Sequence, residues 1–302
     1  MMTALSLLAL SLLAVANPDV GNFSSGSGYA EMPAANAAVY TITVLNTWPI
    51  PAGQQALGLD YIDYWYADNI VAYVSQLDDT IYWMDADNGA AVTPAWDTAD
   101  TNTNAFGVAQ VPETPSAHIH VNDWSMDYIY HRAYNTSWAS YNALCDNKGR
   151  GMDYDDASDK IFEIYTNATP GSYTWYVAMY TPGSSSGSTY QLNCNVSSDW
   201  WASGVTLFPQ WGGGTGIACT MYDSAWIRFF NYPSAPGQVY YGYGILPYDS
   251  QMESSLGLTY SEELGVFFHA WSDASDNYYI SKLDVDAAAL DQATWAEIKA
   301  AF

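Results

Sequence analysis

Three of the four histidines lie close together in the sequence. His118 and His120 stand two residues apart in a strand-like segment, so both side chains face one side. An antiparallel pairing about a turn near Trp124 would set His131 roughly opposite His118. Three imidazoles on one patch suit zinc or copper, which makes these three the candidate metal ligands. A slip of one residue in register would send His131 to the other face, and ordinary packed histidines are the alternative.

Aspartates gather at three expected hairpins: "DADNG" from Asp85, "DYDDASDK" from Asp153 and "SDASDN" from Ser272. Clustered carboxylates bind hard cations, so calcium is the one cofactor that we consider, and no other is expected. None of these segments has the full EF-hand spacing. Aspartate also favours turns because it accepts hydrogen bonds from its own backbone, and turn formation is the alternative.

Two carboxylates occupy one position of a recurring phrase, Asp60 in "GLD" and Asp153 in "GMD". A glycosidase needs two or three carboxylates about 5 to 10 Å apart. The equivalent positions elsewhere hold Ala109, Thr206 and Thr259, and no nucleophile motif or phosphate-binding loop is present. We therefore expect no catalytic residues and no enzyme, with a polysaccharide hydrolase as one alternative.

The recurring phrase is a glycine followed by an aliphatic residue or Met. It recurs at spacings of 49, 44, 53 and 53 residues, at Gly58, Gly107, Gly151, Gly204 and Gly257. Such a period indicates a repeat architecture. We interpret the glycines as points of close backbone approach around a central channel, with simple bulges as the alternative.

Each glycine opens a unit of four short strands joined by turns, which is typical of a β-propeller blade. The predicted fold is all-β: a five-bladed β-propeller of four-stranded blades, with an up-and-down sandwich as the alternative. The expected blades are 55–97, 105–146, 149–194, 202–248 and 255–286. The fifth unit lacks a fourth strand, and a closing strand at 39–48 supplies it, which removes an open sheet edge.

The two ends of the chain differ from the repeats. Residues 1–16 have the length and the small-residue cleavage site of a signal peptide, and 17–38 form a Gly/Ser-rich flexible arm. Residues 287–302 are predicted to form a C-terminal helix with a capping box at Thr294 and Glu297. We expect a secreted protein, extracellular or at the cell surface.

The composition of the chain limits the classes of molecule that it can bind. The chain has 32 acidic and 7 basic residues and a formal net charge of −25, which argues against nucleic acid and anionic membranes. No segment beyond the N-terminal run has the length to span a membrane.

Among Cys145, Cys194 and Cys219 one disulfide can form, and the sequence does not choose the pair. The 26 Tyr and 13 Trp can stack on sugars or form interfaces, or can simply favour strands.

The five glycine-led units between Gly58 and Asp286 resemble secreted bacterial β-propeller repeat proteins. No WD40 signature is present. The resemblance implies a shape, and function must be argued from sites.

The leading functional expectation is an exported, non-enzymatic structural subunit that assembles with itself. A closing strand on a flexible arm can complete a neighbour's blade as well as its own, and aromatic outer strands offer a second contact. Whether the strand acts within one chain or between chains stays open. The alternative is a monomeric, lectin-like propeller that binds a glycan or a cell-surface partner.

Overall fold

The computed structural model describes residues 38–62, 69–98, 104–112, 117–126, 128–133, 136–145, 149–169, 172–193, 201–210, 214–222, 224–233 and 238–287. These residues form twenty β-strands and one 3-10 helix, η1 (Asp249–Gln251), so the chain is all-β as predicted. The predicted signal peptide, the arm up to residue 37 and the C-terminal helix from residue 288 lie outside the described residues.

The strands form five antiparallel groups of four, taken in chain order. The first is β2 (Leu59–Ile62), β3 (Ile70–Ser75), β4 (Thr80–Asp85) and β5 (Ala91–Asp97). The second is β6 (Ala105–Val111), β7 (His118–Asp123), β8 (Tyr128–Ala133) and β9 (Ala139–Asn142). The third is β10 (Gly149–Asp155), β11 (Lys160–Thr169), β12 (Ser172–Tyr180) and β13 (Gly187–Asn193). The fourth is β14 (Ala202–Pro209), β15 (Thr215–Met221), β16 (Ser224–Asn231) and β17 (Gln238–Ile245).

The fifth group takes its strands from both ends of the described chain. It consists of β18 (Met252–Ser261), β19 (Val266–Asp273), β20 (Tyr278–Ala287) and β1 (Ala38–Pro49). β1 pairs antiparallel with β20 from Tyr40 opposite Ala287 to Pro49 opposite Tyr279, with a register shift between Val44 and Asn46. The segment expected as a closing strand at 39–48 therefore pairs with β20 and supplies the fourth strand of the fifth group.

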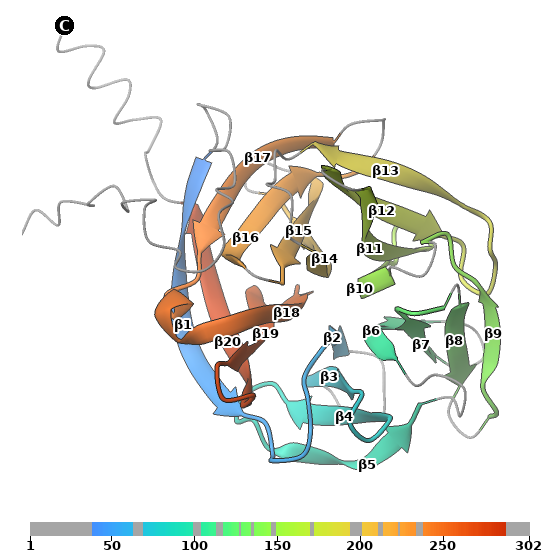
Figure 1. Cartoon of the computed structure of the whole chain (residues 1–302), viewed down its shortest axis with the longest axis horizontal. Helices are drawn as coiled ribbons and strands as arrows, with labels where there is room; N and C mark the ends of the chain where they lie inside the picture. Colours follow the sequence, from blue (N-terminus) through green and yellow to red (C-terminus); the bar gives the residue numbers. More distant parts are fainter. Residues whose placement is uncertain are drawn as a thin grey trace, which may run out of the picture.

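The groups are arranged around an axis, with β2, β6, β10, β14 and β18 innermost (Figure 1). This is a β-propeller-like arrangement. The hydrogen bonding differs from five separate sheets, however, because β17 pairs in parallel with β13 over two residues and with β1 over three. These short parallel bridges merge the last three groups into a twelve-stranded sheet, while the first two remain four-stranded sheets. The merging occurs where the outermost strands of neighbouring groups meet at the rim (Figure 1).

The repeated glycines lie where neighbouring innermost strands touch. A Cβ placed on Gly107 of β6 would stand 2.2 Å from the backbone oxygen of Arg150 on β10. A Cβ on Gly257 of β18 would stand 2.4 Å from the backbone oxygen of Leu57, which precedes β2. Any side chain at these positions would push the strands apart, so glycine permits the ring to close tightly. The residues that follow the five glycines are all buried: Leu59, Val108, Met152, Val205 and Leu258.

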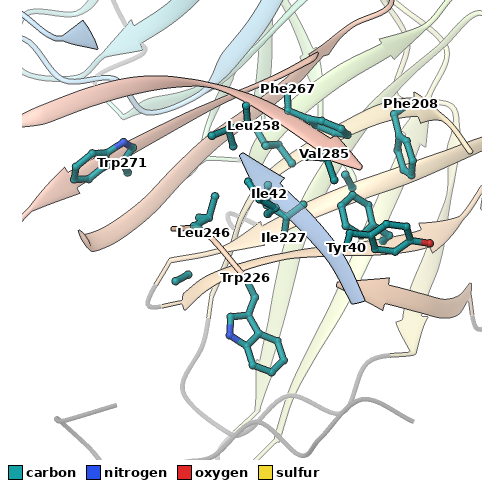
Figure 2. Close-up of a cluster of buried hydrophobic side chains, with 14 of the residues drawn as sticks. Tyr40, Ile42, Phe208, Trp226, Ile227, Leu246, Leu258, Phe267, Trp271 and Val285 are labelled. Carbon is teal, nitrogen blue, oxygen red and sulfur yellow. The ribbon is translucent and has the colours of Figure 1, made fainter. Parts of the chain in front are cut away.

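Alternation in β1 explains why this strand closes the ring. Tyr40 and Ile42 are buried, whereas Val39 and Leu45 are about half exposed, at 50% and 51%. Figure 2 shows Tyr40 and Ile42 entering a cluster that includes Ile227 of β16 and Val285 of β20. The strand thus joins the fourth group to the fifth through apolar contact as well as hydrogen bonds.

Within the described ranges, no helix combines the length and the apolar character needed to cross a bilayer.

Candidate functional site

The three histidines share one face of the second group. His120, not His118, pairs with His131, and His118 lies opposite Ala133. This register differs by two residues from the expected one, so the face is the same and the ring centroids lie 5.1 to 6.4 Å apart. His120 Nδ1 lies 3.1 Å from the hydroxyl of Tyr141. In the part of the chain that the structure describes, no group of three or more His, Cys, Asp or Glu could hold a metal ion, so the structure lends the predicted metal site no support.

The acidic hairpins use their carboxylates to build turns. Asp85 Oδ1 accepts hydrogen bonds from the backbone N–H groups of Asp87 and Asn88 at 2.9 and 3.0 Å. Asp273 accepts from the side chain and backbone of Asn277, and these hydrogen bonds lower the pKa of Asp273 to about 2. Because the oxygens serve local turns, the geometry favours turn formation over calcium binding at these hairpins.

Asp60 and Asp153 tie neighbouring groups together. Asp60 Oδ2 accepts a hydrogen bond from the backbone N–H of Gln110 in β6, at 2.5 Å. Asp153 Oδ2 accepts one from the backbone N–H of Leu207 in β14, at 2.6 Å. Thr259 Oγ1, at the same repeat position, accepts from the backbone of β2 at 3.0 Å. The two carboxylates therefore link one innermost strand to another, and the geometry does not pair them as the acid and base of a glycosidase.

A serine and a histidine lie in contact inside the fifth group, although neither was a predicted site residue. Ser255 Oγ lies 2.8 Å from His269 Nε2, and the Tyr248 hydroxyl lies 2.6 Å from His269 Nδ1. The pair has the spacing of a nucleophile and its base. However, Ser255 and His269 are fully buried, and burial lowers the pKa of His269 to about 3. The imidazole is therefore neutral, and the three side chains satisfy one another within the core.

A buried carboxylate joins the second and third groups. Glu163 Oε2 accepts hydrogen bonds from the Tyr180 hydroxyl at 2.6 Å and from Cys145 Sγ at 2.8 Å. Asn122 Nδ2 donates to Glu163 Oε1 at 2.5 Å and to the backbone oxygen of Arg150 at 2.6 Å. Burial raises the pKa of Glu163, while these donors and the positive charge of Arg150 lower it. The network fixes the start of β10 and thereby the place of Arg150.

Arg150 stands at the end of the ring where the innermost strands begin, and aromatic rings surround it. Its guanidinium carbon lies 4.5 Å from the ring centroid of Trp124, 5.4 Å from Phe106 and 5.8 Å from Trp201. Trp124 belongs to the turn after β7, Phe106 to β6, and Trp201 precedes β14. We call these four residues the Arg150 cage. Three different groups of the ring build it.

The guanidinium in this cage remains charged but has few polar partners. Its one hydrogen bond to a described residue is Nη1–H to the backbone oxygen of Gly149, at 3.3 Å. Burial lowers the pKa of Arg150 to about 10, and the nearby Tyr222 and Glu163 partly offset this effect. At neutral pH the group is therefore a cation that is half-buried among aromatic rings. Such a group is suited to hold an anion or a polar ligand at its in-plane N–H groups.

Sequence reasoning missed Arg150, although a signal was present. The residue before each repeated glycine is Leu57, Phe106, Arg150, Ser203 or Leu256. One strong cation stands where the other repeats place apolar residues or serine, in a chain with only 7 basic residues. A departure from the repeat at an innermost position is the pattern that could have identified it.

Comparison with known proteins gives similarity of fold. The sequence matches no protein-family model and no curated protein. Among solved structures it is similar to a family 117 glycoside hydrolase from the marine bacterium Zobellia galactanivorans, with 9% identity, a TM-score of 0.50, and coverage of 84% of this chain and 92% of that chain. It is also similar to a nidogen/laminin complex (13% identity, TM-score 0.49, coverage of 74% and 77%). A third is virginiamycin B lyase from Staphylococcus aureus (10% identity, TM-score 0.43, coverage of 80% and 73%).

These similarities correct one expectation. The expectation that the chain is not an enzyme, made from the absence of catalytic motifs, is contradicted, because the family 117 glycoside hydrolase has a similar fold. At such low identity the likeness extends to the fold alone. Function must therefore be argued from the Arg150 cage.

Proposed function

We propose that the protein is a five-bladed β-propeller that binds a carbohydrate at the Arg150 cage. The observation that carries this proposal is the position of a charged guanidinium among Trp124, Trp201 and Phe106 at the axial end of the ring. The five blades correspond to the five antiparallel groups, and the parallel bridges of β17 are contacts between blade rims.

The chemistry of the cage favours a sugar over other ligands. Tryptophan and tyrosine rings offer flat apolar faces with a polar edge, which match the C–H faces and hydroxyls of a sugar ring. Tyr222, 40% exposed, is bound to Trp201 by a backbone hydrogen bond of 2.8 Å and extends the aromatic surface. A net charge of −25 disfavours nucleic acid as the ligand. The glycoside hydrolase with a similar fold adds support for the carbohydrate class.

The test is binding of a panel of oligosaccharides, measured by calorimetry on the full chain. We expect saturable binding of at least one sugar, and loss of it in Trp124→Ala. Trp138→Ala is the matched control, because Trp138, like Trp124, is half-buried and contacts an arginine, Arg132, that lies outside the cage. Incubations with the bound sugar, analysed for shortened or modified products, test whether the ligand is also a substrate. A panel without any binding would contradict the proposal.

Export and self-assembly remain predictions within this proposal. The apolar run at residues 4–16 favours export, and N-terminal sequencing of protein recovered from the culture medium tests it. The pairing of β1 with β20 of its own chain supports a monomer, whereas strand exchange requires the same pairing between two chains. A solution mass at one chain would contradict the filament prediction.

A further inference from the structure

The guanidinium carbon of Arg150 lies over the rings of three aromatic residues. Trp124 is closest, with its centroid at 4.5 Å, and Phe106 and Trp201 lie within 6 Å. A guanidinium that stacks on an aromatic ring keeps its in-plane N–H groups available for hydrogen bonds. Only one such N–H is engaged by a described residue, weakly, at the Gly149 backbone oxygen.

The position of this cation is fixed by the backbone and not by a counter-ion. The backbone oxygen of Arg150 accepts from Asn122 Nδ2, and the β6 backbone at Gly107 packs directly against it. Glu163 lies close enough to raise the pKa of Arg150, yet its oxygens accept from Tyr180, Cys145 and Asn122. Among the described residues, the structure contains no ion pair between Arg150 and a carboxylate. A preorganised guanidinium without a paired anion is suited to accept one from a ligand.

We propose, on the basis of the carbohydrate function above, that the sugar bound at the Arg150 cage is acidic and that its oxyanion pairs with the in-plane N–H groups of Arg150. A carboxylate of a uronic acid and a sulfate ester share this chemistry, because the guanidinium fork matches both. The aromatic rings position the sugar and exclude water, which strengthens the ion pair.

The overall charge makes this proposal testable through salt. A net charge of −25 repels an anionic sugar at long range, while the contact with Arg150 attracts it at short range. Salt screens distant exposed charges first, because the Debye length is about 10 Å at 0.1 M, and partly buried pairs are screened less. Binding of an acidic sugar should therefore strengthen as ionic strength rises from a low value. Binding through an ordinary surface ion pair would instead weaken as the ionic strength rises.

The experiment compares three short oligosaccharides of equal length by calorimetry: a uronate oligomer, the same oligomer with its carboxylates reduced to alcohols, and a sulfated neutral oligomer. We expect the uronate or the sulfated sugar to bind about thirtyfold or more tightly than the reduced sugar, since removal of one partner from a desolvated charge pair has an effect of this size. Preference for one of the two acidic sugars identifies the source of the oxyanion.

Three variants test whether the preference for acidic sugars depends on Arg150 and not on another arginine that contacts aromatic rings. Arg150→Gln should remove the preference, and Arg150→Lys should reduce it because the planar fork is lost. Arg132→Gln is the matched control: Arg132 lies 4.2 Å from the centroid of Trp96 and 5.0 Å from that of Trp138, away from the cage. We expect it to bind like the unmodified protein.

The outcomes distinguish the two proposals. Equal binding of charged and reduced sugars would overturn the acidic-ligand inference and leave the carbohydrate proposal standing. No binding of any sugar would overturn both. If Arg150→Gln fails to fold, the comparison of the three sugars and the salt series on the unmodified protein still decide the inference.

Discussion

Replacement of Ile42 by alanine tests whether β1 belongs to the cooperative fold. Ile42 is 7% exposed and lies in the cluster with Ile227 and Val285 (Figure 2). A Cβ on Gly244 would stand 2.6 Å from Ile42 Cδ1, so this side chain rests directly on the β17 backbone. Because β1 is held by β20 on one side, the space left by the removed methyl groups cannot collapse easily. An Ile→Ala change in such a site costs about 3 kcal/mol.

The assay is thermal and denaturant unfolding of the full chain. About 3 kcal/mol corresponds to a fall in Tm of about 6–12 °C for a domain of this size. Leu45→Ala is the matched control, because Leu45 lies on the same strand but is 51% exposed, and we expect a change below about 0.5 kcal/mol. An unchanged Tm for Ile42→Ala would show that β1 is not part of the cooperative unit in solution. Equal losses for both variants would show that the outer face of β1 is covered, for instance by a second copy.

Three further predictions concern the ring and its buried groups. Gly107→Ala should lower the free energy of unfolding by about 3 kcal/mol or more, or prevent folding, because the new Cβ would meet the Arg150 backbone. Gly183→Ala is the control, because nothing lies within 4 Å of its Cβ position and φ is +69°. We expect it to lower the free energy of unfolding by only about 1–2 kcal/mol in denaturant unfolding. Burial raises the pKa of Asp153 to about 6. The contribution of Asp153 to stability is therefore fully present below its unfolded pKa near 4 and is lost as the pH rises through about 6. The unfolding free energy should fall over this window by up to about 3 kcal/mol, and Asp153→Asn should flatten that fall. Because burial lowers the pKa of His269, its stabilising effect is present above about pH 6.5 and is lost as the pH falls toward 3. NMR should therefore find this imidazole neutral at pH 5. A titration of His269 near pH 6.5 would refute the burial argument.

The sequence predicted the elements because their signals are local. β-Branched and aromatic runs between turn residues define strands, and a period of about fifty residues indicates a repeat whose units must pack on one another. The strand expected at 39–48 occupies 38–49, because the alternation that buries Tyr40 and Ile42 can be read without the fold. The spare strand at one end and the missing strand at the other pointed to the same pairing.

The roles of polar residues depend on the partner strand, which a local pattern does not contain. Asp60 and Asp153 look alike in the sequence as catalytic candidates, and only the ring shows that each accepts a backbone N–H from the next innermost strand. The register of His131 likewise depends on how tightly the turn after β7 closes, and it differs from the expected one by two residues.

The sequence by itself determined that the chain is a repeated all-β protein with a strong acidic charge and glycines at fixed intervals. Only the tertiary structure decided where a ligand could bind. Phe106 and Arg150 share one repeat position, but no spacing rule connects them with Trp124 and Trp201, and the four residues span three repeats. They meet because the glycine contacts draw the innermost strands together, so that the turns and strand starts of neighbouring groups converge at one end of the ring.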